Sequence, residues 1–249
     1  MKQLVLLLCL TISTCCLWAQ SFVIDGLKYQ VIKGNKVELL GSDVELADTV
    51  RVPSEIVHNG KRYKVIRIGT NAFMGAEMVA IELPNTLQSI GSEAFLGCPK
   101  LGNLEIPNSV TEIEVEAFSC CSSLKYIKLP ERLKYIEYKL LFGCKSLKYL
   151  VIPNRVNHIY ASAFADCSSL LRIELSSNTK SIGCEAFAEC TKLQEIWCRA
   201  ERVPKIECPF PDNVSKYYIP KEKATKYIEK WNIDSKKVIS LFKNPMVIR

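Results

Sequence analysis

The sequence has few of the residues from which most enzyme and metal sites are built. Its 249 residues include only two histidines, and neither lies in a nucleophile motif. It contains no Gly-x-Ser-x-Gly and no phosphate-binding glycine loop. After residue 19 no Cys-x-x-Cys occurs, and the cysteines and histidines lack zinc-ligand spacing. These absences predict a chain with no catalytic residues, no bound metal and no cofactor.

Long apolar runs are also missing beyond the N-terminus, so we expect no integral membrane span. Residues 1–19 differ: Lys2 gives a positive start, residues 4–17 are mostly apolar, and Ala19 offers a small residue for cleavage. This order is typical of a secretory signal peptide. Lipoprotein processing at Cys15 or Cys16 is the rival interpretation, but no small-residue box precedes either cysteine. We therefore expect export to the periplasm, the cell surface or the extracellular medium.

A strong charge of one sign is absent from most of the chain. The formal net charge is +7, yet residues 21–198 hold 20 basic and 20 acidic side chains. The last 51 residues carry 12 basic against 6 acidic side chains and account for nearly all of the excess. A nucleic-acid partner is therefore not expected, because such proteins show a basic patch or stripe over the binding domain.

What the sequence does contain is a repeat of 23 residues. Five units have cysteine at one position: Cys98, Cys121, Cys144, Cys167 and Cys190. Isoleucine and leucine positions recur at the same step. The clearest copy runs from Ile90 through Ala94-Phe95, Cys98 and Leu101 to Leu104, Ile106 and Pro107. Agreement in phase at this many positions predicts a stack of equivalent units.

Each unit predicts one short strand. Leu104 and Ile106 alternate with polar residues, the period of a strand with one buried face, and Pro107 ends the strand because it cannot donate to a ladder. One unit cannot bury its apolar groups alone, but stacked units share a continuous core. We predict a right-handed parallel solenoid with one sheet of about eight strands, centred on Val50, Ile81, Leu104, Ile127, Leu150, Ile173, Ile196 and Tyr217.

The outer segments predict caps. Phe22 to Ile32 and Val37 to Leu40 read as two strands, and Asn59-Gly60 predicts a hairpin turn. Tyr227 and Trp231 lie four residues apart and indicate a short closing helix. The expected division is residues 1–19 signal peptide, 20–67 N-terminal β cap, 68–198 repeats and 199–249 C-terminal cap.

Nine cysteines follow the signal peptide. The five at the repeat position predict free, buried thiols, because a stack points its side chains alike and not toward one another. Cys198 and Cys208 lie outside that position, in a compartment where disulfides persist, so they are candidates for a bridge.

The repeat resembles the BspA-like class of bacterial surface-antigen leucine-rich repeat. The N-terminal residues Asp25-Gly26-Leu27-Lys28-Tyr29 and the C-terminal Tyr218-Ile219-Pro220 with Trp231 are similar to the usual ends of that family. Ser109 departs from the common leucine-rich consensus, which has Asn or Cys after the strand. The resemblance implies a secreted or surface-displayed protein used for binding and adhesion, and it brings no catalytic residues.

A binding site is expected on the outward side of the strands, because residues flanking a buried strand centre must face solvent. Exposed aromatics beside cations are typical of interface hot spots. Tyr and Val also have high strand propensity, which would explain their presence without a binding role. The candidate residues are Lys125, Tyr126, Lys128, Lys148, Tyr149, Val151, Arg172 and Trp197. The expected partner is an extracellular protein or glycan. A carbohydrate-binding accessory role and, less favoured, an enzyme with an unrecognised site remain as alternatives, and Lys221, Lys223, Lys226 and Lys230 form the next candidate site.

Overall fold

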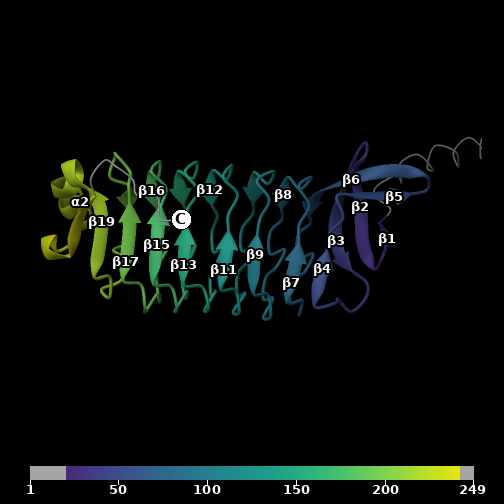
Figure 1. Ribbon diagram of the computed structural model, residues 1–249, viewed down its shortest axis with the longest axis horizontal. Helices are drawn as coiled ribbons and strands as arrows, with labels where there is room; N and C mark the ends of the chain where they lie inside the picture. Colours follow the sequence, from purple (N-terminus) through teal and green to yellow (C-terminus); the bar gives the residue numbers. More distant parts are fainter. Residues whose placement is uncertain (1–20, 242–249) are drawn as a thin grey trace, which may run out of the picture.

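The structure is a computed structural model that describes residues 21–241. The predicted signal peptide, residues 1–19, lies outside the described residues. The repeats stack side by side into an elongated β-solenoid, with a sheet-rich end at the N-terminus and the only α-helix of the described chain at the other end (Figure 1).

The eight predicted strands are all present and run parallel on one side of the solenoid, the strand face. The register pairs Leu104 with Ile127 and Ile173 with Ile196, as the repeat length requires. The ladder is interrupted between β7 and β9 and between β11 and β13, so the face predicted as one sheet comprises three successive ladders. Its strands are β4 (Thr49–Arg51), β7 (Ala80–Glu82), β9 (Asn103–Glu105), β11 (Tyr126–Lys128), β13 (Tyr149–Val151), β15 (Arg172–Leu175), β17 (Glu195–Cys198) and β19 (Lys216–Pro220).

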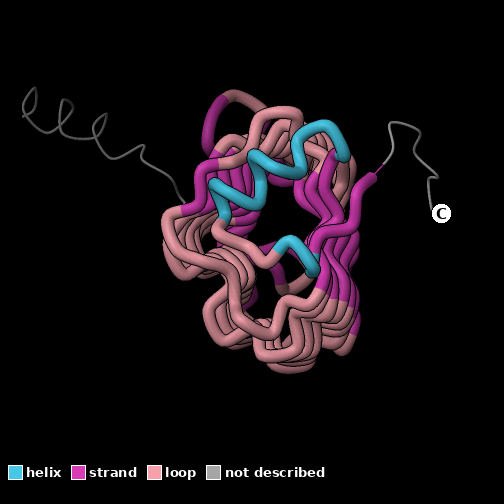
Figure 2. Tube along the Cα trace, turned by 90° about the vertical axis from the view of Figure 1, so that its left-hand side faces the viewer, coloured by secondary structure: helices cyan, strands magenta, loops and turns pink. Residues whose placement is uncertain are grey.

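A second set of strands lies on the opposite side, which we call the return face; Figure 2, a view along the solenoid, shows both sides. Each of these strands has two residues, and its isoleucine is buried or nearly so. The sequence did not predict them as strands. They are β8 (Ser89–Ile90), β10 (Glu112–Ile113), β12 (Tyr135–Ile136), β14 (His158–Ile159), β16 (Ser181–Ile182) and β18 (Lys205–Ile206).

The core between the two faces is filled by the repeated apolar positions. Phenylalanine rings stack from repeat to repeat, with Phe95 lying 5.3 Å from Phe73 and 5.2 Å from Phe118 between ring centroids. One repeat has Leu140 and Leu141 in place of the Ala-Phe pair, and both leucines are fully buried. The two side chains occupy nearly the same total volume, a change that cores tolerate.

The five repeated cysteines are free and buried, as predicted. Each also donates its S–H to a backbone carbonyl about one repeat back, for example Cys121 Sγ to Phe95 O at 3.1 Å and Cys144 Sγ to Phe118 O at 3.3 Å. The thiol is small enough for the core and gives the carbonyl a second donor, since Phe95 O and Phe118 O also accept from the backbone N–H groups of Cys98 and Cys121. The position is therefore a hydrogen-bonding one as well as an apolar one.

The N-terminal end is a small mixed sheet. Its strands are β1 (Phe22–Ile24), β2 (Leu27–Lys33), β3 (Lys36–Ser42), β5 (Glu55–His58) and β6 (Lys61–Ile68). The hairpin at Asn59-Gly60 is confirmed by the antiparallel pairing of β5 with β6. The single strand predicted over Phe22 to Ile32 is wrong: a turn at Asp25-Gly26, both with positive φ, divides it into β1 and β2. Strand β6 pairs with β8 and so joins this sheet to the repeats.

The C-terminal end closes over the core with η1 (Lys221–Lys223), α2 (Ala224–Trp231) and η2 (Ser235–Lys237). Tyr227 and Trp231 of α2 are buried, as their spacing predicts. Tyr227 Oη donates to Ala200 O at 2.6 Å and Trp231 Nε1 donates to Pro204 O at 3.0 Å. A ninth strand, β20 (Val238–Leu241), which the sequence did not predict, pairs with β19.

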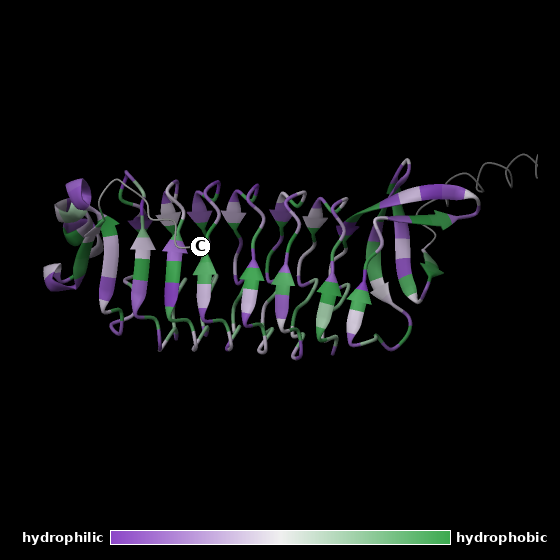
Figure 3. Ribbon diagram, in the orientation of Figure 1, coloured by the Kyte–Doolittle hydropathy of each residue, from purple (hydrophilic) through white to green (hydrophobic). Residues whose placement is uncertain are grey.

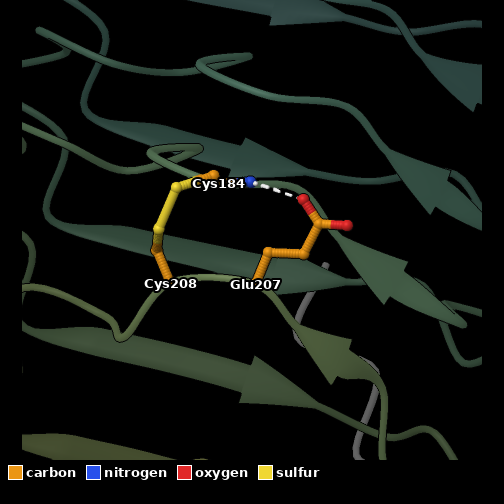
Figure 4. The surroundings of a disulfide bond; sticks show 3 residues. All are labelled: Cys184, Glu207 and Cys208. Atoms are coloured by element: carbon orange, nitrogen blue, oxygen red, sulfur yellow. Dashed lines mark hydrogen bonds between the residues drawn. A yellow bond between two sulfur atoms is a disulfide. The ribbon is translucent and has the colours of Figure 1, made fainter.

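One disulfide joins the last repeat to this end, and its pairing corrects the prediction. Cys208 is bonded to Cys184 and not to Cys198 (Figure 4). The two cysteines lie on neighbouring turns of the return side, with Cα atoms 4.8 Å apart. Cys198 is buried on β17 with its Sγ 3.3 Å from Tyr227 Oη, so it packs against the closing helix.

Candidate binding surface on the strand face

The middle of the strand face carries three exposed apolar or aromatic side chains: Tyr126 of β11 and Tyr149 and Val151 of β13. Their exposed fractions are 45%, 59% and 61%. Each flanks a buried strand centre, Ile127 or Leu150, so the strand geometry directs it outward. We call these three residues the open patch.

Three lysines predicted with the open patch surround it. Lys125 and Lys148 are exposed and precede the two tyrosines in the chain. Lys128 lies 3.7 Å from Glu105 on the neighbouring strand, so part of its charge is balanced. Among the hydrogen bonds and ion pairs of the described chain none involves the side chains of Lys125 or Lys148. The open patch is therefore bordered by two unbalanced cations.

Arg172 and Trp197 also lie on the strand face, but they are engaged with their neighbours and are only partly exposed. The Arg172 guanidinium lies 4.2 Å from the Trp197 ring centroid and also pairs with Glu174. Trp197 stacks on Tyr218 at 3.9 Å between ring centroids. We call Arg172, Trp197 and Tyr218 the stacked row. It forms a pre-ordered wall beside the open patch.

The open patch and the stacked row meet at a shallow hollow of about 250 Å³. Val151, Arg172 and Trp197 line it, together with Pro153 and Arg199. Figure 3 shows why this part of the face differs: β13 is hydrophobic over most of its length, whereas β15 has hydrophilic segments on both sides of its hydrophobic centre. The structure thus brings Val151, Arg172 and Trp197 to one concave place, which Glu131 and Glu174 also line, whereas the predicted lysines lie outside its lining.

Sequence reasoning missed a second group of exposed rings, on the return face. Tyr135, Tyr138 and Tyr160 are each more than 40% exposed, and the Tyr135 ring lies 6.2 Å from Tyr160 and 6.0 Å from His158. A signal was present in the sequence. The position after the repeated isoleucine is glycine in the outer units but Glu114, Glu137 and Tyr160 in the middle ones.

The groups on the strand face are of the kind that contact a partner. Within residues 21–241 no group of His, Cys, Asp or Glu side chains is arranged to hold a metal ion. In the same range no helix is both long and apolar enough to cross a bilayer. What the face presents is apolar area, ring faces and lysine ammonium groups on a rigid strand scaffold, which are the components of an interface.

The repeat region matches the family model of the BspA type leucine rich repeat region over residues 66–194, in six copies. A solved leucine-rich repeat protein of T. pallidum, TpLRR, is 26% identical, with a TM-score of 0.68 over 86% of this chain and 97% of that one. A leucine-rich repeat protein of Eubacterium ventriosum is 19% identical, with a TM-score of 0.60 over 92% of this chain and 52% of that one. No curated protein matches the chain. With more than half of its residues in matching repeats, the chain belongs to the BspA-type leucine-rich repeat family.

Proposed function

We propose that this protein is an exported, non-enzymatic binding protein that uses its strand face to contact an extracellular protein or glycan. Its family is typical of bacterial surface proteins. The observation that carries the proposal is the open patch: Tyr126, Tyr149 and Val151 are exposed together on rigid strands.

Exposure of the open patch to water is unfavourable, and a bound partner would remove its apolar area from water. Each aromatic side chain can bury 150–250 Å² in an interface, at roughly 25 cal/mol per Å² of apolar area removed from water. Tyrosine is enriched in hot spots because it offers large contact area with few rotatable bonds. Two tyrosines and a valine on one face can therefore anchor a partner.

The surroundings indicate the partner's chemistry. Lys125 and Lys148 border the open patch without a balancing carboxylate among the described residues. They favour a partner with acidic groups around an apolar contact, and attraction of this kind weakens as salt is added. The hollow beside Val151 and Trp197 suits one protruding side chain or one sugar ring of that partner.

The test starts from a panel of purified extracellular protein domains and an array of immobilised glycans, both probed with the labelled protein. Every hit is then probed with Tyr126→Ser/Tyr149→Ser, which removes both rings of the open patch. We expect at least a tenfold loss of binding, with an unchanged thermal midpoint because both side chains are exposed.

Tyr135→Ser/Tyr160→Ser is the matched control, since it removes two exposed tyrosines from the return face. It should bind as the unchanged protein does. Full binding by the strand-face variant, or an unchanged protein that binds no member of either panel, would contradict the proposal.

A glycan-binding role centred on the return face is the second candidate, favoured by the grouping of Tyr135, His158 and Tyr160. Ring faces at this spacing are suited to stacking on sugars. The same pair of variants separates the two functions: glycan binding lost only in Tyr135→Ser/Tyr160→Ser would assign the site to the return face.

A further inference from the structure

The basic excess of the C-terminal segment gathers in one place. A groove of about 740 Å³ runs between the last return-face turn and helix α2. Six cations line it and a single carboxylate, Glu201, accompanies them. We call this the basic groove; its cations are Lys180, Arg202, Lys205, Lys223, Lys226 and Lys230.

The cations form two walls. Lys223, Lys226 and Lys230 come from η1 and α2, and the distance from the first to the last is about 10 Å along a helix that rises 1.5 Å per residue. Lys180, Arg202 and Lys205 come from the last repeat and β18 on the other side. Between the walls lie the apolar side chains of Val203, Pro204 and Ile206.

The walls are held in place by buried contacts. Trp231 of α2 donates to Pro204 O, which belongs to the floor of the basic groove. Tyr227 of α2 donates to Ala200 O, and both rings are buried. The Cys184–Cys208 bridge fixes the segment that carries Lys205 to the repeat before it. The groove is therefore pre-formed, which lowers the entropic cost of binding.

Its charges are unbalanced. In the described part of the chain none of the six cations forms an ion pair with a carboxylate. Lys226 and Lys230 are four residues apart on α2, where like charges repel each other. This arrangement works against stability, and an anionic ligand would relieve it.

The lining indicates which anion fits. In a groove of about 740 Å³ with cations on two walls, one small anion cannot contact all of the cations, so a ligand with several anionic groups is required. No aromatic side chain lines the basic groove, whereas single-stranded nucleic acids bind to grooves in which their bases stack on aromatic side chains. Lysine dominates, and its point charge suits sulfate and carboxylate groups without the planar bidentate geometry of arginine.

We propose that the basic groove binds a linear anionic polysaccharide, with sulfate or carboxylate groups along the chain paired to both lysine walls and sugar C–H groups against Val203, Pro204 and Ile206. This site is at the end of the solenoid and is independent of the open patch.

The probe is a heparin-derived octasaccharide, measured by calorimetry with the full exported chain. We expect binding that weakens steeply between low and high salt, because each ion pair is screened. In Lys223→Gln/Lys226→Gln/Lys230→Gln the affinity should fall at least tenfold. Glutamine has nearly the helix propensity of lysine, so circular dichroism should show an intact fold.

A matched control removes the same charge at the other end of the solenoid, through Lys33→Gln/Lys36→Gln/Lys64→Gln, all exposed. It should stay within twofold of the unchanged protein. Equal losses in the two triple variants would overturn the proposal, because they would indicate a net-charge effect. Tighter binding of poly-glutamate or of phosphatidylglycerol vesicles than of the octasaccharide would overturn it in favour of an acidic peptide or a lipid surface.

The strand-face variant Tyr126→Ser/Tyr149→Ser separates this site from the proposed function. It should keep full affinity for the octasaccharide. Loss of that affinity in the strand-face variant, with full affinity in the groove variant, would overturn the basic groove while leaving the open patch supported.

Discussion

At the scale of the residue, the repeated cysteine shows how one side chain meets two demands. The site requires a small apolar group, and the S–H also donates to a backbone carbonyl, as Cys144 does to Phe118 O. Burial also raises the pKa of the Cys144, Cys167 and Cys190 thiols, to about 12 for Cys190, whereas a hydrogen bond with Cys121 lowers the pKa of Cys98. Thiolate is the reactive form, so Cys144, Cys167 and Cys190 are protected by protonation as well as by burial, and Cys98 is protected by burial.

The first prediction concerns the contrast between the exposed thiol of Cys120 and the buried thiols. Iodoacetamide under native conditions at pH 8 should modify Cys120, which is exposed, and spare the buried Cys98, Cys121, Cys144, Cys167, Cys190 and Cys198. In denaturant all of these should react. Peptide mass spectrometry reads each site separately. Native modification of Cys144 at the rate of Cys120 would contradict the buried assignment.

The second prediction concerns the stacked phenylalanines. Phe118→Ala should lower the free energy of unfolding by about 3–5 kcal/mol, because it opens a cavity of aromatic size. Arg132→Ala, at an exposed position of the following repeat, should change it by under about 0.5 kcal/mol. Glu116, two residues before Phe118, is no suitable control, since it is half-buried with φ +55°. Equal denaturation midpoints for the two variants would show that Phe118 does not fill the core.

Among the elements, the eight strands of the strand face could be predicted from the sequence. The two-residue strands of the return face, the Cys184–Cys208 pairing and β20 could not. The 23-residue phase fixes which isoleucines and leucines share a face, and all eight strands appear. Strands of two residues, such as Ser89–Ile90, leave no alternation to detect. The last turn has one more residue, so Cys184 and Cys208 are 24 apart and a search at 23 does not align them. Strand β20 follows a lysine-rich segment whose composition is typical of an exposed loop, so the sequence did not indicate a further strand.

The third prediction concerns the disulfide. Cys184→Ser/Cys208→Ser should lower the free energy of unfolding by about 3 kcal/mol, because the bridge closes a loop of 24 residues in the unfolded chain. The loss should be seen first in the fluorescence of Trp231, which is buried at that end. Cys120→Ser, at a free exposed thiol, serves as control and should be neutral. Identical unfolding curves for the double variant and the unchanged protein would refute a stabilising role.

The fourth prediction concerns the carboxylates of the return face. Burial, followed by repulsion from Glu112 and Glu114, raises the pKa of Glu137 above its usual range. The folded state then holds this proton more tightly than the unfolded state, so stability falls as pH rises through the glutamate range. Glu137→Gln should therefore have the higher thermal midpoint at pH 7, and the difference should vanish below about pH 4. A lower midpoint for the variant at pH 7 would show that the ionised carboxylate is stabilising.

At the scale of the whole molecule, the sequence predicted the open patch well and its neighbours less well. Alternation about Ile127 and Leu150 is enough to place Tyr126, Tyr149 and Val151 outside. It does not show that Arg172 and Trp197 are engaged, because stacking between turns depends on side-chain conformation. Of the basic groove, the sequence indicated only the wall with Lys223, Lys226 and Lys230, because Lys205 and Lys180 of the other wall lie 18 and 43 residues before Lys223.

The solenoid thus separates three surfaces on one rigid body: the strand face, the return face and the C-terminal groove. The proposed function depends on contact between the partner and the strand face. Photo-crosslinking tests it most directly, with p-benzoyl-phenylalanine placed at Tyr149 or, on the opposite side, at Tyr160, and with a hit from the protein or glycan panel as the partner. We expect a covalent adduct from position 149 and none from position 160. An adduct from position 160 alone would contradict the proposed function.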